Sequence, residues 1–183
     1  MDAARQRLAP EIAELLRLID EGYEKRAWHG PNLRGAVRGL TARQAAWRPG
    51  PGRHNIWEIV LHCAYWKYAV CRRILGAKRG SFPRKGSNWI TQPHPQGDPA
   101  WRQDLALLAD MHRQLRTAVA GLGPRDLDAV PRGSRVSTRA IVGGVAMHDV
   151  YHAGQIQLVK RLARSRESRR ARTVDHTRSE EHD

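Results

Sequence analysis

Two histidines four residues apart, His148 and His152, are the residues whose type and spacing most directly suggest chemistry. Positions i and i+4 of a helix lie on one face, with Cβ atoms roughly 5–6 Å apart. Two imidazoles placed in this way can occupy two positions around one metal ion, as in the H-E-x-x-H type of zinc site. With 9 histidines in 183 residues, the spacing alone is a weak signal, so its meaning depends on the surrounding elements.

The sequence around the two histidines predicts one long helix, from about Thr138 to Leu162. At 100° per residue, both histidines fall in the same stripe, roughly 120° wide, as the apolar residues of this segment. They therefore face the interior of the fold. Gly143 and Gly144 each cost a helix about 1 kcal/mol relative to alanine, so we expect another helix to pack closely against them.

A third histidine with the same placement lies in a second predicted helix, Asn55–Leu75. Asn55 as N-cap, with Glu58 three residues later, has the pattern of a capping box. His62 lies inside the apolar stripe of this helix and not on its polar side. The two helices therefore direct three imidazoles toward the same interior.

Four long amphipathic helices with no competing strand pattern predict an all-α protein, a four-helix bundle. The first helix is expected at about Ala3–Arg26, and the third starts with Asp98 as N-cap and Pro99 as its first helical residue. Thr41 is expected to cap a short helical turn between the first and second long helices.

A long basic loop, Gly76–Asp98, connects the second and third helices. Loops of this length in a compact domain are usually functional or disordered, and three apolar residues suggest that part of it packs onto the bundle: Phe82, Trp89 and Ile90. The bundle domain is expected at residues 1–163. Residues 164–183 lack apolar periodicity and are expected to form a disordered tail.

Composition limits the classes of function. The formal net charge is +14, but the basic residues are 27 Arg and only 5 Lys, spread over all segments. A nucleic-acid binder is expected to concentrate them on one stripe, so nucleic acid is not the expected partner. No apolar run could span a membrane and no signal-peptide core is present. The two cysteines form no C-x-x-C pair, and we expect a cytoplasmic protein.

His62, His148 and His152 together have the composition of a catalytic metal centre. Three neutral imidazoles satisfy Zn²⁺ and leave one position for water or substrate, although Ni²⁺ or Fe²⁺ would also suit the set. The alternative is that each histidine is an ordinary core residue, but three unliganded buried imidazoles would need three sets of partners. His112, on the third helix, is similarly placed and is taken as a core residue or a support for the ligands.

Four segments resemble the DinB-like (YfiT-type) superfamily of four-helix-bundle, metal-dependent enzymes. The strongest are H-N-I-W-E-I-V-L-H-C-A-Y-W at His54–Trp66 and H-D-V-Y-H-A-G-Q at His148–Gln155. Ala27–Trp47 and Leu108–Leu115 are also similar, so the resemblance covers about residues 3–163.

The resemblance implies that His62, His148 and His152 bind a divalent metal ion, since the three positions match the ligand pattern of the family. It also implies a small-molecule substrate, with a low-molecular-weight thiol as cosubstrate in an S-transferase or isomerase reaction, and a homodimer. It does not imply which substrate is used.

Other side chains could support or surround this centre. Glu58 and Gln155 lie within one helical turn of a ligand and could hydrogen-bond to its imidazole, or could be a helix cap and a polar bundle contact, respectively. Asp149 lies about 100° off the ligand face and is expected to be exposed or ion-paired. Trp66 and Tyr151 could line a pocket or belong to the core.

Three functions remain open on this basis. In the first, the protein is an enzyme, an S-transferase or hydrolase, whose metal ion activates a thiol or water. Arg84 or Arg135 could then hold an anionic cosubstrate. In the second, a non-catalytic, metal-stabilised bundle binds nucleic acid or protein through its basic surface. In the third, the histidines hold a structural metal ion or none.

Overall fold

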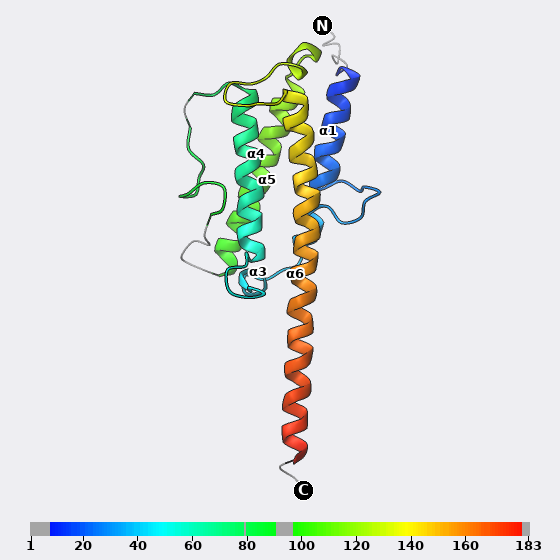
Figure 1. Ribbon diagram of the computed structural model, residues 1–183, viewed down its shortest axis with the longest axis vertical. Helices are drawn as coiled ribbons and strands as arrows, with labels where there is room; N and C mark the ends of the chain where they lie inside the picture. The colour runs from blue at the N-terminus through cyan, green and yellow to red at the C-terminus, as the bar shows by residue number, and fades with distance from the viewer. Residues whose placement is uncertain (1–7, 79, 91–96, 181–183) are drawn as a thin grey trace.

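The computed structural model describes residues 8–78, 80–90 and 97–180, with side chains as far as Ser168, and is drawn in Figure 1. The described residues contain helices and no strand. The long helices are α1 (Pro10–Tyr23), α4 (Ile56–Ile74), α5 (Asp98–Ala120) and α6 (Thr138–Glu180), and the short ones are α2 (Leu33–Val37), α3 (Ala42–Ala46) and the 3-10 helix η1 (Pro124–Leu127). This confirms the predicted all-α bundle. None of these helices has the length and apolar character needed to cross a bilayer.

The packing of the long helices makes α4 and α6 neighbours. α4 packs against α5 on one side and α6 on the other, while α1 packs against both α5 and α6. One apolar cluster joins α4 and α5 with the short helices around the fully buried Trp57, and a second joins α1, α5 and α6 around Ile12 and Val142. The inward faces of α4 and α6, which carry the three histidines of interest, therefore meet inside the bundle.

Two of the predicted helix starts are confirmed and one is corrected. Thr41 and Asn55 each cap their helix, and each forms a complete capping box. Asp98 is not an N-cap. It is the first residue of α5, and its carboxylate accepts a hydrogen bond from the backbone N–H of Ala42 at 2.7 Å. This carboxylate satisfies a free N–H at the start of α3, where negative charge is favoured, and so joins two helices.

The ends of the first and last helices also differ from the prediction. Leu8 and Ala9 are not helical, because proline restricts the residue before it to extended backbone and α1 starts at Pro10; residues 1–7 lie outside the described range. α6 continues past Leu162 to Glu180 and projects beyond the bundle (Figure 1). The sequence predicted an unstructured tail from residue 164, whereas the structure has a helix as far as Glu180. No glycine or proline follows Gly154, and a nucleated helix extends readily through arginine, alanine and glutamate.

Close packing of α6 depends on a glycine in another helix. A Cβ atom added at Gly143 or Gly144 would have no neighbour within 4 Å, so the expected close packing at these positions is absent. A Cβ atom added at Gly22 of α1 would instead lie 2.8 Å from the backbone oxygen of Ala146. Gly22 therefore allows α1 to approach the backbone of α6.

This difference gives a matched pair of variants. Gly22→Ala is expected to lower the free energy of unfolding by about 1–3 kcal/mol, because the backbones of α1 and α6 must separate. Gly144→Ala is expected to raise it by up to about 1 kcal/mol, since alanine favours a helix and the space is open. Urea unfolding followed by circular dichroism measures both. Equal effects of the two variants would contradict the close approach at Gly22.

The loop between α4 and α5 packs onto the bundle as predicted. Ile90 is buried, and Phe82 and Trp89 are partly buried against the cluster around Trp57. Asn88, just before Trp89, has a φ of 56°, in the left-handed region that asparagine tolerates better than most residues. The loop therefore holds a fixed, locally unusual backbone over α4.

Candidate metal centre

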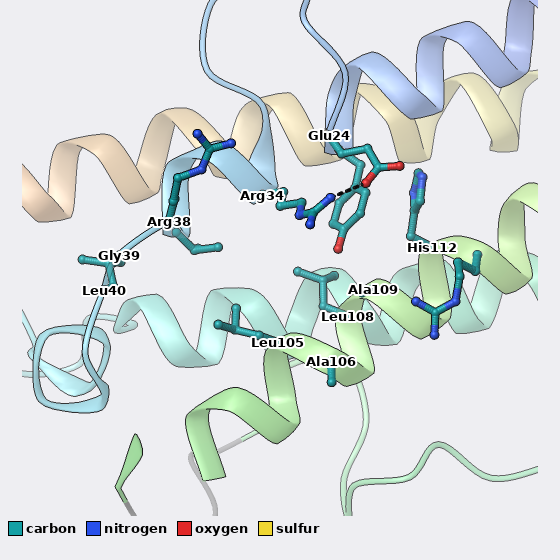
Figure 2. A pocket seen from close by; sticks show the side chains of 13 residues that line it. Glu24, Arg34, Arg38, Gly39, Leu40, Leu105, Ala106, Leu108, Ala109 and His112 are labelled. Carbon is teal, nitrogen blue, oxygen red and sulfur yellow. Dashed lines mark hydrogen bonds and ion pairs between the residues drawn. The ribbon is translucent and has the colours of Figure 1, made fainter. Parts of the chain in front are cut away.

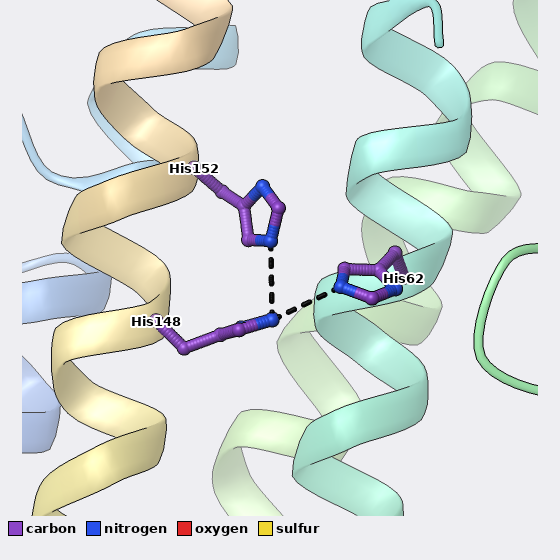
Figure 3. A group of neighbouring side chains, drawn as sticks. All are labelled: His62, His148 and His152. Carbon is purple, nitrogen blue, oxygen red and sulfur yellow. Dashed lines mark hydrogen bonds between the residues drawn. The ribbon is translucent and has the colours of Figure 1, made fainter.

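The Nε2 atoms of three histidines converge between α4 and α6 (Figure 3). His148 Nε2 lies 3.0 Å from His62 Nε2 and 3.1 Å from His152 Nε2. Three nitrogens bound to one tetrahedral zinc ion at about 2.0–2.1 Å would lie roughly 3.3 Å apart. The sequence-predicted triad is thus brought together with a spacing close to that of a ligand set.

Hydrogen bonds to carbonyl oxygens fix the tautomers of two of the three rings. His62 Nδ1 lies 2.9 Å from the backbone oxygen of Asn88, and His152 Nδ1 lies 2.7 Å from Gln155 Oε1. A carbonyl oxygen only accepts, so in both rings Nδ1 carries the proton and Nε2 presents its lone pair. A histidine that binds a metal ion through one ring nitrogen commonly donates the N–H of its other ring nitrogen to an oxygen in the same way.

The electrostatic surroundings keep these rings neutral. Burial, reinforced by the neighbouring imidazoles, lowers the pKa of His148 to about 3. Burial lowers the pKa of His152 to about 4, even though the bond to Gln155 acts in the opposite direction. Burial also lowers the pKa of His62. All three lone pairs are therefore available to a metal ion at neutral pH.

A second group of possible ligand atoms, from Cys63, His148 and Asp149, is less suited to a metal ion. These atoms also lie within 4.8 Å of one another. However, burial raises the pKa of the Cys63 thiol well above its ordinary value, which opposes formation of the thiolate that a metal needs. The carboxylate of Asp149 is already paired with Lys67. The three-histidine group is thus the better metal site.

The comparison with protein families agrees with this geometry. The model of the DinB superfamily matches residues 25–156, which include His62, His148 and His152. The chain belongs to the DinB superfamily. No curated protein matches the sequence. The matched range contains α4 and the part of α6 that carries His148 and His152.

Three of the predicted supporting or pocket residues of this DinB-superfamily chain lie around the centre. Gln155 hydrogen-bonds to His152, as described, and its Nε2 donates to the hydroxyl of Tyr151 at 2.9 Å. The Tyr151 ring stands edge-on to His152 at 5.0 Å between centroids, and with 63% of its surface exposed it lies outside the core. Trp66 stands edge-on to both His62 and His148.

The structure places Glu58 away from the triad. Its carboxylate completes the capping box with Asn55, pairs with Arg48 at 2.5 Å and lies 3.1 Å from His54 Nδ1. It therefore serves as the helix cap that the sequence offered as its alternative role. Arg84, a candidate for holding an anion, is paired with Asp104 at 2.6 Å and so is already neutralised.

His112 and Asp149 have structural surroundings. His112 is buried on α5 and stacks on Tyr23 with 4.1 Å between ring centroids, so it belongs to a different part of the bundle from the triad. Asp149 forms an ion pair with Lys67, which is one of the two states expected from the sequence. Both side chains are completely buried.

Two contributors to the centre, Trp89 and Asn88, were not predicted from the sequence. Trp89 stacks on His62 with 3.9 Å between centroids and on His54 with 3.7 Å. Asn88 contributes its backbone oxygen to His62 and its side-chain oxygen to Trp66 Nε1 at 3.0 Å. An irregular loop has no periodicity from which such contacts could be read. The presence of Phe82, Trp89 and Ile90 in a basic loop was the available signal.

Proposed function

We propose that this DinB-superfamily protein is a divalent-metal-dependent enzyme in which His62, His148 and His152 hold the ion. The observation that supports this most strongly is the convergence of three Nε2 atoms, two of which have their lone pairs set by hydrogen bonds at Nδ1. Three protein ligands leave a coordination position for a reactant, as in catalytic rather than structural zinc sites. Three neutral nitrogen ligands favour Zn²⁺, and Ni²⁺ or Fe²⁺ are the alternatives.

The bound ion would supply a Lewis acid that lowers the pKa of a water molecule or a thiol, so that the deprotonated form is available near neutral pH. The reaction class that follows is attack on an electrophilic carbon, with a low-molecular-weight thiol giving S-transfer and water giving hydrolysis. The nucleophile loses its proton to solvent or to a nearby base, and the leaving group departs with the electron pair of the broken bond.

The side chains around the triad would orient the reactants. Asn88 and Gln155 hold two of the imidazoles in place, and Trp66 and Trp89 form an aromatic wall that limits access of water. A cavity of about 660 Å³ adjoins the centre through Trp89 and Gln155. Its other lining, mostly apolar, comes from the 49–54 loop and from Leu158 and its neighbours on α6, which suits the apolar part of an electrophile.

A turnover assay tests this function. Protein purified without a histidine tag is loaded with Zn²⁺, Ni²⁺ or Fe²⁺ in turn and assayed for thiol conjugation of an aryl halide and for ester hydrolysis. We expect turnover with at least one ion. In His62→Ala the turnover rate should fall at least about a hundredfold, because the variant lacks a ligand of the metal ion to which the nucleophile would be bound. His29→Ala, in an exposed loop, is the matched control.

Turnover that is equal in the metal-free protein, or a protein that binds the metal but catalyses neither reaction, would contradict the proposal. In the second case the alternative function, a metal-stabilised basic binding module, would be tested by the salt dependence of its binding to nucleic acid.

A further inference from the structure

A second concave site lies apart from the metal centre, between the end of α1, helix α2 and helix α5 (Figure 2). Its volume is about 550 Å³, within the range of small-molecule sites. It shares no lining residue with the three-histidine group or with the cavity beside it. Any ligand of this pocket would therefore be distinct from the reactants at the metal centre.

The inner surface of the pocket is apolar. Leu105, Leu108 and Ala109 of α5 line it together with Val37 of α2 and Tyr23 at the end of α1. Leu108, Val37 and Tyr23 are all at least 96% buried, so they form a buried floor that is part of the core. A hydrocarbon chain or ring placed on this floor would be removed from water, which stabilises it by about 25 cal/mol per Å² of apolar area.

The entrance of the pocket carries a surplus of positive charge. Three arginines line it, and two of them are neutralised: Arg34 by Glu24 at 2.7 Å (Figure 2), and Arg113 by Asp110 at 2.9 Å. The third, Arg38, is exposed and has no ion-pair partner among the described residues. A guanidinium group presents a planar fork of donors that matches a carboxylate, so an anion is favoured here over a cation.

A buried imidazole also lines this pocket with unused hydrogen-bonding capacity. His112 is 2% exposed, and neither ring nitrogen has a hydrogen-bond partner among the described residues. Asp20 Oδ1 is 3.4 Å from Nε2, but both oxygens of that carboxylate accept from Arg116 Nε. A buried polar group without a partner is costly, so a polar ligand atom or a water molecule that reached His112 would be stabilised.

We propose that this pocket binds a small organic anion with an apolar body, of the class of medium-chain carboxylates. The carboxylate pairs with Arg38 at the entrance, and the hydrocarbon chain lies on Leu105, Leu108 and Val37. The proposal is independent of the function of the metal centre, because the two sites have different residues.

Isothermal titration with octanoate tests the proposal on the full chain. We expect saturable binding of about one octanoate per chain, with octanol and octylamine at least tenfold weaker because neither pairs with a guanidinium group. Arg38→Gln is expected to weaken octanoate binding about tenfold, since a charge-assisted hydrogen bond is lost. Arg102→Gln is the matched control, because Arg102 is an exposed arginine of α5 that does not line the pocket.

A second variant tests the location of the site. Ala109→Phe places a ring in the half-buried wall of the pocket and is expected to abolish octanoate binding while the metal content and the circular dichroism spectrum stay unchanged. His148→Ala is expected to bind octanoate as the wild type does, which excludes the metal centre as the site. Absence of saturable binding, octanol binding as tightly as octanoate, or normal binding by Arg38→Gln or Ala109→Phe would overturn the proposal.

Discussion

The wild-type protein is expected to take up about one metal ion per chain, and His148→Ala is expected to lose it. His148 occupies the central position of the triad, because its Nε2 lies within 3.1 Å of both other Nε2 atoms. Four-ligand zinc sites bind with about 10–16 kcal/mol, so one ligand is worth roughly 3 kcal/mol, or more than a hundredfold in affinity. Mass spectrometry of protein prepared without a nickel column measures the metal content directly.

The control for this variant is His29→Ala, which removes an exposed imidazole and should leave the metal content unchanged. A wild-type protein that cannot be loaded with Zn²⁺, Ni²⁺ or Fe²⁺ would show that the triad is a hydrogen-bonded core cluster. Equal metal content in His148→Ala and wild type would place the ion elsewhere.

The protonation state of the triad gives a second readout of the same site. Three histidines with the ordinary pKa of about 6.5 would together release roughly two protons when they bind a metal ion at pH 6. In this protein, burial lowers the pKa of His148 to about 3 and of His152 to about 4, and also lowers that of His62. Because His148 and His152 are already neutral and the pKa of His62 is lowered, calorimetric titration with the metal ion at pH 6, in two buffers of different ionisation enthalpy, should show well under two protons released. Release of about two protons would contradict the lowered pKa values.

Asp149→Ala is expected to destabilise the metal-free protein by about 3–5 kcal/mol, because it leaves the ammonium group of Lys67 buried without its counter-charge. Lys67 and Asp149 are each completely buried, and the ammonium group of Lys67 also lies 5.2 Å from the centroid of the Tyr23 ring. Replacing both residues, as Lys67→Met with Asp149→Leu, is expected to recover most of the loss, since an apolar pair needs no solvation. Urea unfolding of the three proteins measures the difference.

An exposed ion pair provides the comparison. Glu14→Ala breaks the contact of Glu14 with Arg17 on α1, where both side chains are at least half exposed, and is expected to cost less than about 1 kcal/mol. If Asp149→Ala costs no more than Glu14→Ala, the buried pair does not carry the charge that the structure assigns to it.

The parts of the fold and site that were predictable from the sequence are those that follow helical periodicity. The apolar stripes of α4 and α6 place His62, His148 and His152 on facing surfaces, and a spacing of four residues brings two of them together. Gln155, three residues after His152, was found by the same rule. Capping residues such as Thr41 and Asn55 were predictable because their pattern is local.

The rest depends on contacts between elements, which periodicity does not contain. Asp149 lies off the apolar stripe of α6, and it is buried because α1 covers that flank. A Cβ atom built on Gly22 would lie 3.5 Å from the Cβ of Asp149, so the absence of a side chain at Gly22 allows α1 to exclude water there. Likewise, the contact of Asn88 with His62 follows from how an irregular loop folds back over α4.

The order of the helices along the chain has a consequence for how the metal centre is assembled in the cell. His62 lies in α4, whereas His148 and His152 both lie in α6, the last helix of the bundle. During translation the N-terminal part of a chain leaves the ribosome first, so α4 emerges with a single imidazole while the other two ligands have not yet been synthesised. One imidazole alone retains a metal ion poorly. If the triad binds a metal ion as proposed, the ion can be captured only after α6 has been synthesised, and a nascent chain arrested before α6 would remain free of metal.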